Sequence, residues 1–319
     1  MKGSQTSFPD LTFMGAFGAD WLGVVLIALL SFALGFYLNR GSICTVIATA
    51  DLVARKRPAR SIALLEAAVW AGLVYAVLNM SPFMPEGWLP LGYLVFGTVL
   101  FAVGSYVNGA CVFGSVGHFG NGEIELALVF VGVFIVKYIE PLTNLLPAQP
   151  PLSMPLQGGA LPLVGILAAL LLGRFFLTRP EEKGFRIVGV TMAAAGITFA
   201  LLVTLTPLFS ITASIETIVS VPVAGAVTIV GMSLGSVTSA VLRESRLKIK
   251  WPTWQGVIKH LAGGMLMGLG AVLIPGGNDT LLLVGLPGVA WQAFVSYALL
   301  VAVLAALIAA FGTRARAWT

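Results

Sequence analysis

The sequence contains few charged residues: Asp, Glu, Lys and Arg make up 10% of its 319 residues, whereas hydrophobic residues make up 58%. A soluble domain carries about 25% charged residues, so this chain has too few to cover a surface that faces water. Helices satisfy their backbone hydrogen bonds internally and can therefore cross a bilayer. The composition predicts an all-α, polytopic membrane protein.

The side chains of common enzyme sites are also scarce. The chain has two cysteines, Cys44 and Cys111, and two histidines, and their spacing matches neither a metal site nor a haem motif. The sequence shows no catalytic triad and no phosphate-binding loop. We therefore expect no catalytic residues, no metal site and no cofactor, and we do not expect an enzyme.

Long apolar segments divide the chain into two halves. About 20 apolar residues span the hydrocarbon core as a helix. Nine segments approach this length, at residues 21–38, 62–79, 91–108, 125–139, 160–177, 187–207, 220–241, 257–274 and 289–311. We assign a first half at about 21–139, a linker helix at 160–177 and a second half at 187–311, within one transmembrane domain covering 1–319. Because a single linker span inverts the second half, we expect a pseudo-symmetric inverted repeat.

Three further apolar pieces are too short to span, at residues 41–48, 109–117 and 280–286. We expect short re-entrant helices there, which are tolerated where protein or a cavity covers them. The segments Leu100–Cys111 and Leu266–Asn278 are weakly similar, which would place Cys111 beside Asn278 in the two repeats.

Basic residues predict the orientation. Fourteen of the 18 Lys and Arg lie on one side of the bilayer. They are Arg55, Lys56, Arg57 and Arg60 after the first segment, Arg174, Arg179, Lys183 and Arg186 from the end of the fifth to the start of the sixth, Arg243, Arg246, Lys248 and Lys250 after the seventh, and Arg314 and Arg316 after the ninth. The loops 80–90, 140–159, 208–219 and 275–288 contain none. We expect the protein in the cell inner membrane. The positive-inside rule predicts that its amino terminus is outside and its carboxyl terminus is in the cytoplasm. This asymmetry accounts for the net charge of +5, so we expect no nucleic-acid partner.

Glycines interrupt the helical pattern around Cys111 and again near the end of the chain. Broken helices with small and polar residues, in corresponding parts of two halves, are typical of a transport site. The candidate substrate-binding residues are Cys44, Cys111, Gly41, Ser42, Asn108, Gly109, Gly276, Gly277, Asn278 and Asp279.

The two thiols favour one kind of ligand. In an apolar setting a cysteine stays protonated, and a neutral S–H group can face an anion without charge repulsion. A soft sulfur atom on the substrate suits it, while the N–H groups of short helices could bind an oxyanion. Each cysteine could instead be a small core residue. Asp279 is interpreted equally well as a functional carboxylate, for example in proton coupling, or as a helix cap.

Three motifs, Asn39–Cys44, Gly109–Gly114 and Pro275–Asp279, resemble the YeeE/YedE family of sulfur-transport membrane proteins. The resemblance implies an hourglass-like, pseudo-symmetric helical protein that takes up thiosulfate and passes it between cysteine thiols. Cys44 and Cys111 correspond to two of those cysteines. Members that carry thiosulfate have a further functional cysteine in the second half, which this chain lacks. A different sulfur or selenium species therefore stays open as the substrate.

The leading hypothesis is a membrane permease for a small sulfur-containing anion, thiosulfate first, along a path lined by Cys44, Cys111 and the Asn278–Asp279 turn. The alternative is a thiol-redox or sulfur-transfer protein with the two cysteines as a redox pair. A third hypothesis is an accessory subunit without a pathway of its own. The expected partners are the anion and the lipid bilayer, and a small sulfur-carrier protein on the cytoplasmic side is a candidate.

Overall fold

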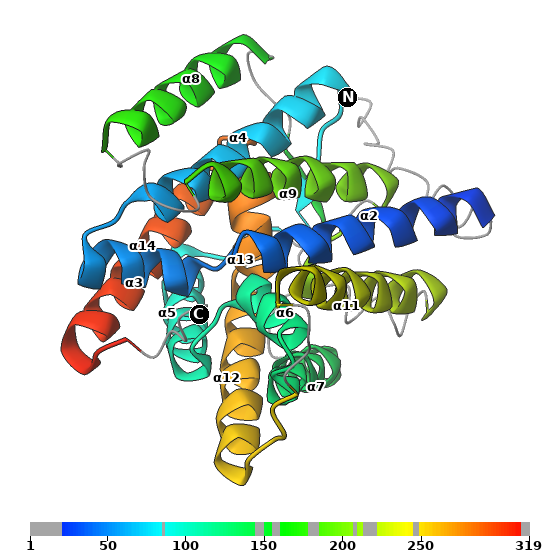
Figure 1. Ribbon diagram of the computed structural model, residues 1–319, viewed down its shortest axis with the longest axis vertical. Coiled ribbons are helices and arrows are strands. Elements are labelled where there is room, and N and C mark those ends of the chain that lie inside the picture. Colours follow the sequence, from blue (N-terminus) through cyan, green and yellow to red (C-terminus); the bar gives the residue numbers. More distant parts are fainter. Residues whose placement is uncertain are drawn as a thin grey trace, which may run out of the picture.

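Most of the described residues, 81%, are helical (Figure 1). The structure is a computed structural model that describes residues 21–84, 87–143, 150–154, 160–177, 185–206, 209–212, 222–244 and 249–313. Its long helices are α2 (Trp21–Arg40), α4 (Ala59–Val77), α5 (Leu91–Asn108), α7 (Ala127–Thr143), α8 (Ala160–Leu177), α9 (Phe185–Leu205), α11 (Pro222–Glu244), α12 (Trp254–Leu273) and α14 (Trp291–Phe311). Two short strands, β1 (Phe83–Met84) and β2 (Leu152–Ser153), pair antiparallel. The expected all-α fold is confirmed.

Each of the nine expected spans coincides with a long helix. The bounds of α5 and α8 agree with the expected ones, and the others differ by at most four residues at either end. By length and composition, seven helices in the described part could cross a membrane. The other two are α7, with 17 residues, and α8, whose apolar part spans only Leu161–Leu177. A multi-pass membrane protein is therefore supported, while nine spans stay a prediction.

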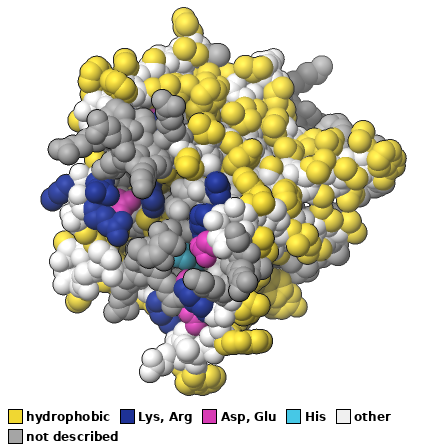
Figure 2. Space-filling view, in the orientation of Figure 1, with side chains coloured by type: hydrophobic (Ala, Val, Ile, Leu, Met, Phe, Trp, Pro, Cys, Tyr) yellow, Lys and Arg dark blue, Asp and Glu magenta, His cyan; other side chains and the backbone are white. Residues whose placement is uncertain are grey.

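The surface is apolar where the helices face outward. Large hydrophobic side chains are widely exposed, among them Leu161 at 82% and Phe176 at 78% on α8. Figure 2 shows hydrophobic side chains over the top and right of one face, with charged side chains gathered at its left and lower centre. Such an apolar surface would be unstable in water and suits contact with lipid.

Helix pairs approach closely where glycine removes the side chain. On the α2–α11 pair, a methyl group on Gly235 would collide with the Phe32 carbonyl. On the α5–α12 pair, a methyl group on Gly104 would lie 2.8 Å from the Gly263 carbonyl oxygen. Small residues at such contacts let membrane helices pack backbone to backbone.

Helix α8 lies at the edge of the bundle and packs on α4 (Figure 1). There Arg174 Nε lies 2.7 Å from Glu66 Oε1, and both side chains are at most 10% exposed. Charged groups within a membrane are tolerated when they pair with each other. This ion pair therefore fixes the linker helix to the first half.

Short helices lie among the long ones near the centre of the bundle (Figure 1). They are α3 (Thr45–Arg55), α6 (Val112–Gly120), and α13 (Gly277–Thr280) followed by the π-helical turn η2 (Leu281–Gly285); η1 (Ile124–Leu126) is one 3-10 turn before α7. The three expected short pieces are therefore helical, although α3 and α6 begin three to four residues later than expected and α13 begins three earlier. Their starts determine the site.

Candidate functional site

Cys44 and Cys111 each occupy the residue directly before a short helix. Cys44 is the N-cap of α3 and Cys111 is the N-cap of α6, both with extended backbone. Gly109, with φ of 83°, ends α5 and lets the chain turn back, as glycine commonly does after a helix. The glycine before Cys111 thus breaks the apolar segment and sets the cysteine at a helix start.

The two thiols lie in direct contact. The Cys111 thiol donates to Cys44 Sγ at 3.4 Å, and both cysteines are free and almost fully buried. The Thr45 N–H donates to Cys111 Sγ at 3.3 Å, and the Cys111 N–H donates to Cys44 Sγ at 3.4 Å. Each sulfur therefore faces backbone N–H at the start of the other cysteine's helix. Helix N-termini carry a partial positive charge, so the pair lies where an anion would be stabilised.

Gly114 allows this contact. A methyl group on Gly114 would lie 2.6 Å from Cys44 Sγ and 2.9 Å from Cys44 Cβ. The sequence indicated Gly114 only as a break in a pattern, and the structure shows that its missing side chain makes room for the thiol.

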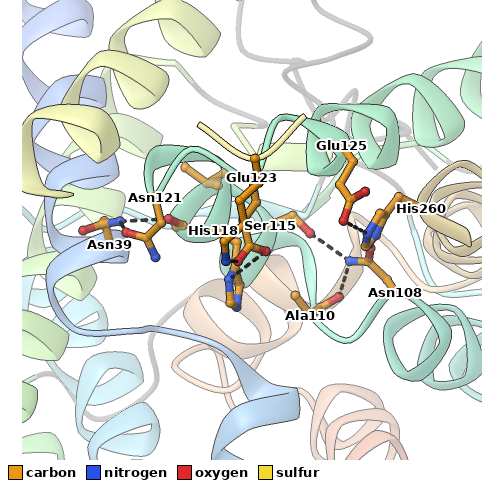
Figure 3. Close-up of polar contacts among 12 residues, drawn as sticks. Asn39, Asn108, Ala110, Ser115, His118, Asn121, Glu123, Glu125 and His260 are labelled. Carbon is orange, nitrogen blue, oxygen red and sulfur yellow. Dashed lines mark hydrogen bonds and ion pairs between the residues drawn. The ribbon is translucent and has the colours of Figure 1, made fainter. Parts of the chain in front are cut away.

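Asn108 supports the turn before Cys111 (Figure 3). Its Nδ2 donates to Ala110 O at 2.7 Å and to Ser115 Oγ at 3.0 Å. Its Oδ1 lies 2.5 Å from His260 Nδ1, and His260 Nε2 lies 3.3 Å from Glu125 Oε1. The Asn108 side chain is thus engaged with the turn and with α12. His260 is fully buried.

A second set of polar side chains fixes the C-terminal end of α6 (Figure 3). Asn39 Nδ2 donates to Asn121 Oδ1 at 2.8 Å. His118 Nδ1 lies 3.5 Å from Glu123 Oε2, and Lys250 Nζ lies 2.8 Å from Glu123 Oε1. Because both ends of α6 are held by buried polar contacts, the position of Cys111 is fixed from two sides.

Gly41 and Ser42 form the turn that leads into Cys44. Both are buried, and Ser42 has the unusual φ of 50° for a residue with a side chain. A methyl group on Gly41 would lie 2.5 Å from Thr191 Oγ1 of α9. These two residues shape the approach of α2 to α3.

The second half presents its own turn next to the thiols. Gly276 and Gly277 have φ of 72° and 84°, and the Thr212 hydroxyl donates to the Gly276 carbonyl. Asn278 Nδ2 lies 3.5 Å from Thr45 Oγ1. Since Thr45 also donates its N–H to Cys111 Sγ, it connects the two turns. Thr45 was missed in the sequence, because its contact with Asn278 joins residues 233 positions apart and no local pattern encodes it.

Asp279 is fully buried beside this contact. Its Oδ2 accepts from the Ile211 N–H at 2.6 Å. Its Oδ1 has no hydrogen-bond partner among the described residues, and the same holds for Asn278 Oδ1 and Thr280 Oγ1. The second-half turn thus contains three buried oxygens that are free to meet a ligand.

The chemistry of the site is that of thiols, backbone N–H groups and side-chain oxygens. Within the described ranges, no three His, Cys, Asp or Glu side chains are grouped so that they could hold a metal ion. The structure brings Cys44, Cys111 and Asn278 together through Thr45, while Asn108 faces Ala110 and His260.

One comparison with known families gives a match. A family model described as sulphur transport matches residues 148–306, about half of the chain. The matched region contains the linker helix, most of the second half and the Gly276–Asp279 turn, whereas Cys44 and Cys111 lie outside it. No protein of curated function matches the sequence.

Proposed function

Because the chain belongs to the sulphur-transport family, as its resemblance to YeeE/YedE proteins indicated, we propose that it is a membrane permease for a small sulfur-containing anion. Thiosulfate is the first candidate. A transport family also agrees with the expectation that the chain is not an enzyme.

The observation that carries the proposal is the pair of thiols at two helix starts. The Sγ atoms of Cys44 and Cys111 are 3.4 Å apart, and each accepts a hydrogen bond from a backbone N–H at the start of the other cysteine's helix. An anion that enters between them can direct its oxygens to N–H donors and its soft sulfur to a thiol. Both kinds of donor are neutral, so they offer hydrogen bonds without holding the anion as an ion pair would.

The second-half turn supplies the other wall of the proposed path. Asn278 reaches Thr45, and Asp279 lies in the same buried group. We infer that Gly276 and Gly277 belong to the path because their missing side chains keep its backbone accessible. Gly41, Ser42, Asn108 and Gly109 position the thiols rather than touch the anion.

An inverted repeat would bring the two turns together at the centre, and the packing supports one. Helix α2 packs on α11 while α9 packs on α4, and α5 packs on α14 while α12 packs on α7. Helix α6 contacts α11, and η2 contacts α4. We match α2, α4, α5, α6 and α7 with α9, α11, α12, η2 and α14. Each of the contacts named above then has its counterpart in the other half.

Glycines at the α5–α12 crossing follow the same symmetry. Gly97 and Gly104 on α5 are seven residues apart, as are Gly263 and Gly270 on α12. A methyl group on Gly104 would lie 2.8 Å from Gly263 O, and one on Gly270 would lie 2.7 Å from Gly97 O. This reciprocal contact supports a pseudo-two-fold axis at the crossing.

Orientation belongs to the proposal as well. By the positive-inside rule, we propose that the amino terminus is outside and the carboxyl terminus in the cytoplasm. The anion would then be delivered to the cytoplasmic side, which carries the Lys and Arg residues. A small sulfur-carrier protein that accepts the anion there is a further proposed partner.

The test is uptake of labelled thiosulfate, sulfate and selenium analogues into vesicles that contain the purified protein. Cys44→Ser and Cys111→Ser should each lower thiosulfate uptake by roughly ten- to a hundredfold, because a hydrogen bond to a charged group contributes about 1.5–3 kcal/mol. Thr98→Ser is a conservative, buried control on α5 and should leave uptake unchanged. Wild-type uptake by both cysteine variants would contradict the thiol path while leaving transport itself intact.

The thiol contact also favours the alternative, a redox pair. Two free sulfurs 3.4 Å apart can form a disulfide with little movement of the chain. Titration of the purified protein with a redox buffer, followed by alkylation of free thiols, measures this. Reversible oxidation together with uptake that requires an electron donor would favour the redox function over the permease.

A further inference from the structure

Unpartnered oxygens cluster at the second-half turn. Asn278, Asp279 and Thr280 are consecutive, each is 0% exposed, and each has one side-chain oxygen without a partner in the described part of the chain. Buried polar atoms are nearly always hydrogen-bonded. Three exceptions in a row therefore indicate a place where the protein meets something other than itself.

Asp279 is the member of this cluster that can carry charge. Among the described acidic residues, Asp51, Glu66, Glu123, Glu125 and Glu244 all lie close to a basic side chain. No such ion pair is found for Asp279 in the described ranges. The Ile211 N–H donates to its Oδ2, and the backbone N–H groups of Asp279 and Thr280 also face the carboxyl.

The described elements packed on the turn place no Lys or Arg beside Asp279 either. Helix α13 packs on α12, η2 and α6. The Cys111 thiol faces Asp279, and Tyr297 of α14 lies beside Cys111 and Cys44. On α6, His118 lies two turns after Cys111, about 10 Å along the helix, and it is beside Glu123. The basic residues of α12, Lys259 and His260, lie more than ten residues before its end, about 20 Å away along the helix. A bare carboxylate in a membrane without a cation is strongly disfavoured.

We propose that Asp279 is a proton-binding site in the transport path: it is protonated in the resting protein, and it donates its Oδ1–H to the anion as the anion passes. Its second oxygen, Oδ2, meanwhile keeps the Ile211 N–H. The role matters only if the chain carries an anion, so it rests on the proposed function.

The protonated carboxyl would do in the second half what the thiols do in the first. An ionised Asp279 would repel an incoming anion, whereas a neutral O–H offers a hydrogen bond without repulsion. Asn278 links this donor to Thr45 and so to the thiols. The anion would then meet neutral donors from both halves.

The first experiment measures thiosulfate uptake into vesicles over a range of external pH. Above the midpoint of the Asp279 titration, wild-type uptake should fall by about tenfold for each pH unit, because the protonated fraction falls by that factor. Asp279→Asn keeps a neutral donor that cannot ionise, so the fall caused by the Asp279 titration should be absent from its pH profile. Any titration of the thiols would persist in this variant and is thereby separated.

Asp51→Asn is the matched control. Asp51 lies 2.9 Å from Arg55 in an ion pair away from the turn, and its neutralisation should leave the wild-type pH dependence in place. A flat wild-type profile, or the wild-type slope in Asp279→Asn, would overturn the proposal.

A second measurement does not depend on transport. The infrared difference between wild type and Asp279→Asn at neutral pH should show the C=O band of a protonated carboxylic acid, and the Asp51→Asn difference should show carboxylate bands. Carboxylate bands for Asp279 would overturn the protonation even if the Asn variant carries no anion. Failure of the wild type to take up any sulfur anion at any pH would instead count against the proposed function, and the infrared band would still report on Asp279.

Discussion

In each half a long helix is followed by a short one after a break of the same length, but the side chains at the two breaks differ. Three residues separate α5 from α6 and three separate α12 from α13. In the first-half turn (residues 109–111) each sulfur of the Cys44–Cys111 pair is satisfied by the other cysteine and its helix. In the second-half turn (residues 274–276) and the start of α13, Asn278, Asp279 and Thr280 keep unpartnered oxygens.

The difference shows that the backbone and the side chains of such a site can vary separately. Both breaks place backbone N–H groups at the start of a short helix. The first half adds polarisable sulfur, and the second adds hard oxygen, so a substrate with a soft and a hard end would suit both. The first half is internally complete, whereas the second is complete only with a ligand or a proton.

The largest loss of uptake is expected when the contact between the two thiols is disturbed while both thiols are kept. Gly114→Ala would place a methyl group 2.6 Å from Cys44 Sγ. Overpacking of this kind costs about 1–3 kcal/mol, and we expect uptake to fall by about tenfold or more. Labelled-anion uptake measures the change, and the reactivity of the two thiols toward an alkylating reagent shows whether the pair has separated.

Gly92→Ala is the control. Gly92 lies at the start of α5, and a methyl group there would meet nothing within 4 Å. It should leave uptake and thiol reactivity as in the wild type. Equal losses in both variants would mean that α5 and α6 tolerate no added volume anywhere, and the thiol contact would lose its special role.

A smaller loss of uptake is expected from a glycine-to-alanine change at the second-half turn. Gly276→Ala forces a side chain into φ of 72° and against the Thr280 side chain. The left-handed backbone costs about 1–2 kcal/mol. The Thr280 hydroxyl can rotate away, and Thr280 Cβ, 2.8 Å from the added methyl group, must shift slightly with its backbone. We expect uptake to fall roughly fivefold and the unfolding temperature to fall by a few degrees.

Gly312→Ala separates strain from crowding. Gly312 has φ of 80° and open space around it, so its variant should lose a similar amount of stability and keep its uptake. Full uptake by Gly276→Ala would show that the second-half turn does not line the path.

The long helices could be predicted from sequence because apolar runs of spanning length leave the chain few alternatives. The short helices were located but their starts were not, since a cysteine N-cap such as Cys44 has no side-chain capping bond to indicate it. The contact between Asn108 and His260 joins residues 152 positions apart, and no local pattern encodes it. Cys44 and Cys111 could be grouped from sequence as candidate site residues, whereas their direct contact and the bridging Thr45 required the arrangement of the short helices.

The smallest effect concerns the link between the halves. Asn278 Nδ2 and Thr45 Oγ1 are 3.5 Å apart, at the limit of a hydrogen bond. Asn278→Ala and Thr45→Val, which keeps the backbone N–H to Cys111, should each lower uptake by less than about fivefold, in keeping with about 1 kcal/mol for a neutral hydrogen bond. In a double-mutant cycle the second change should then add little to the first. If the two losses simply add, the residues act independently, and the two turns are neighbours rather than one site.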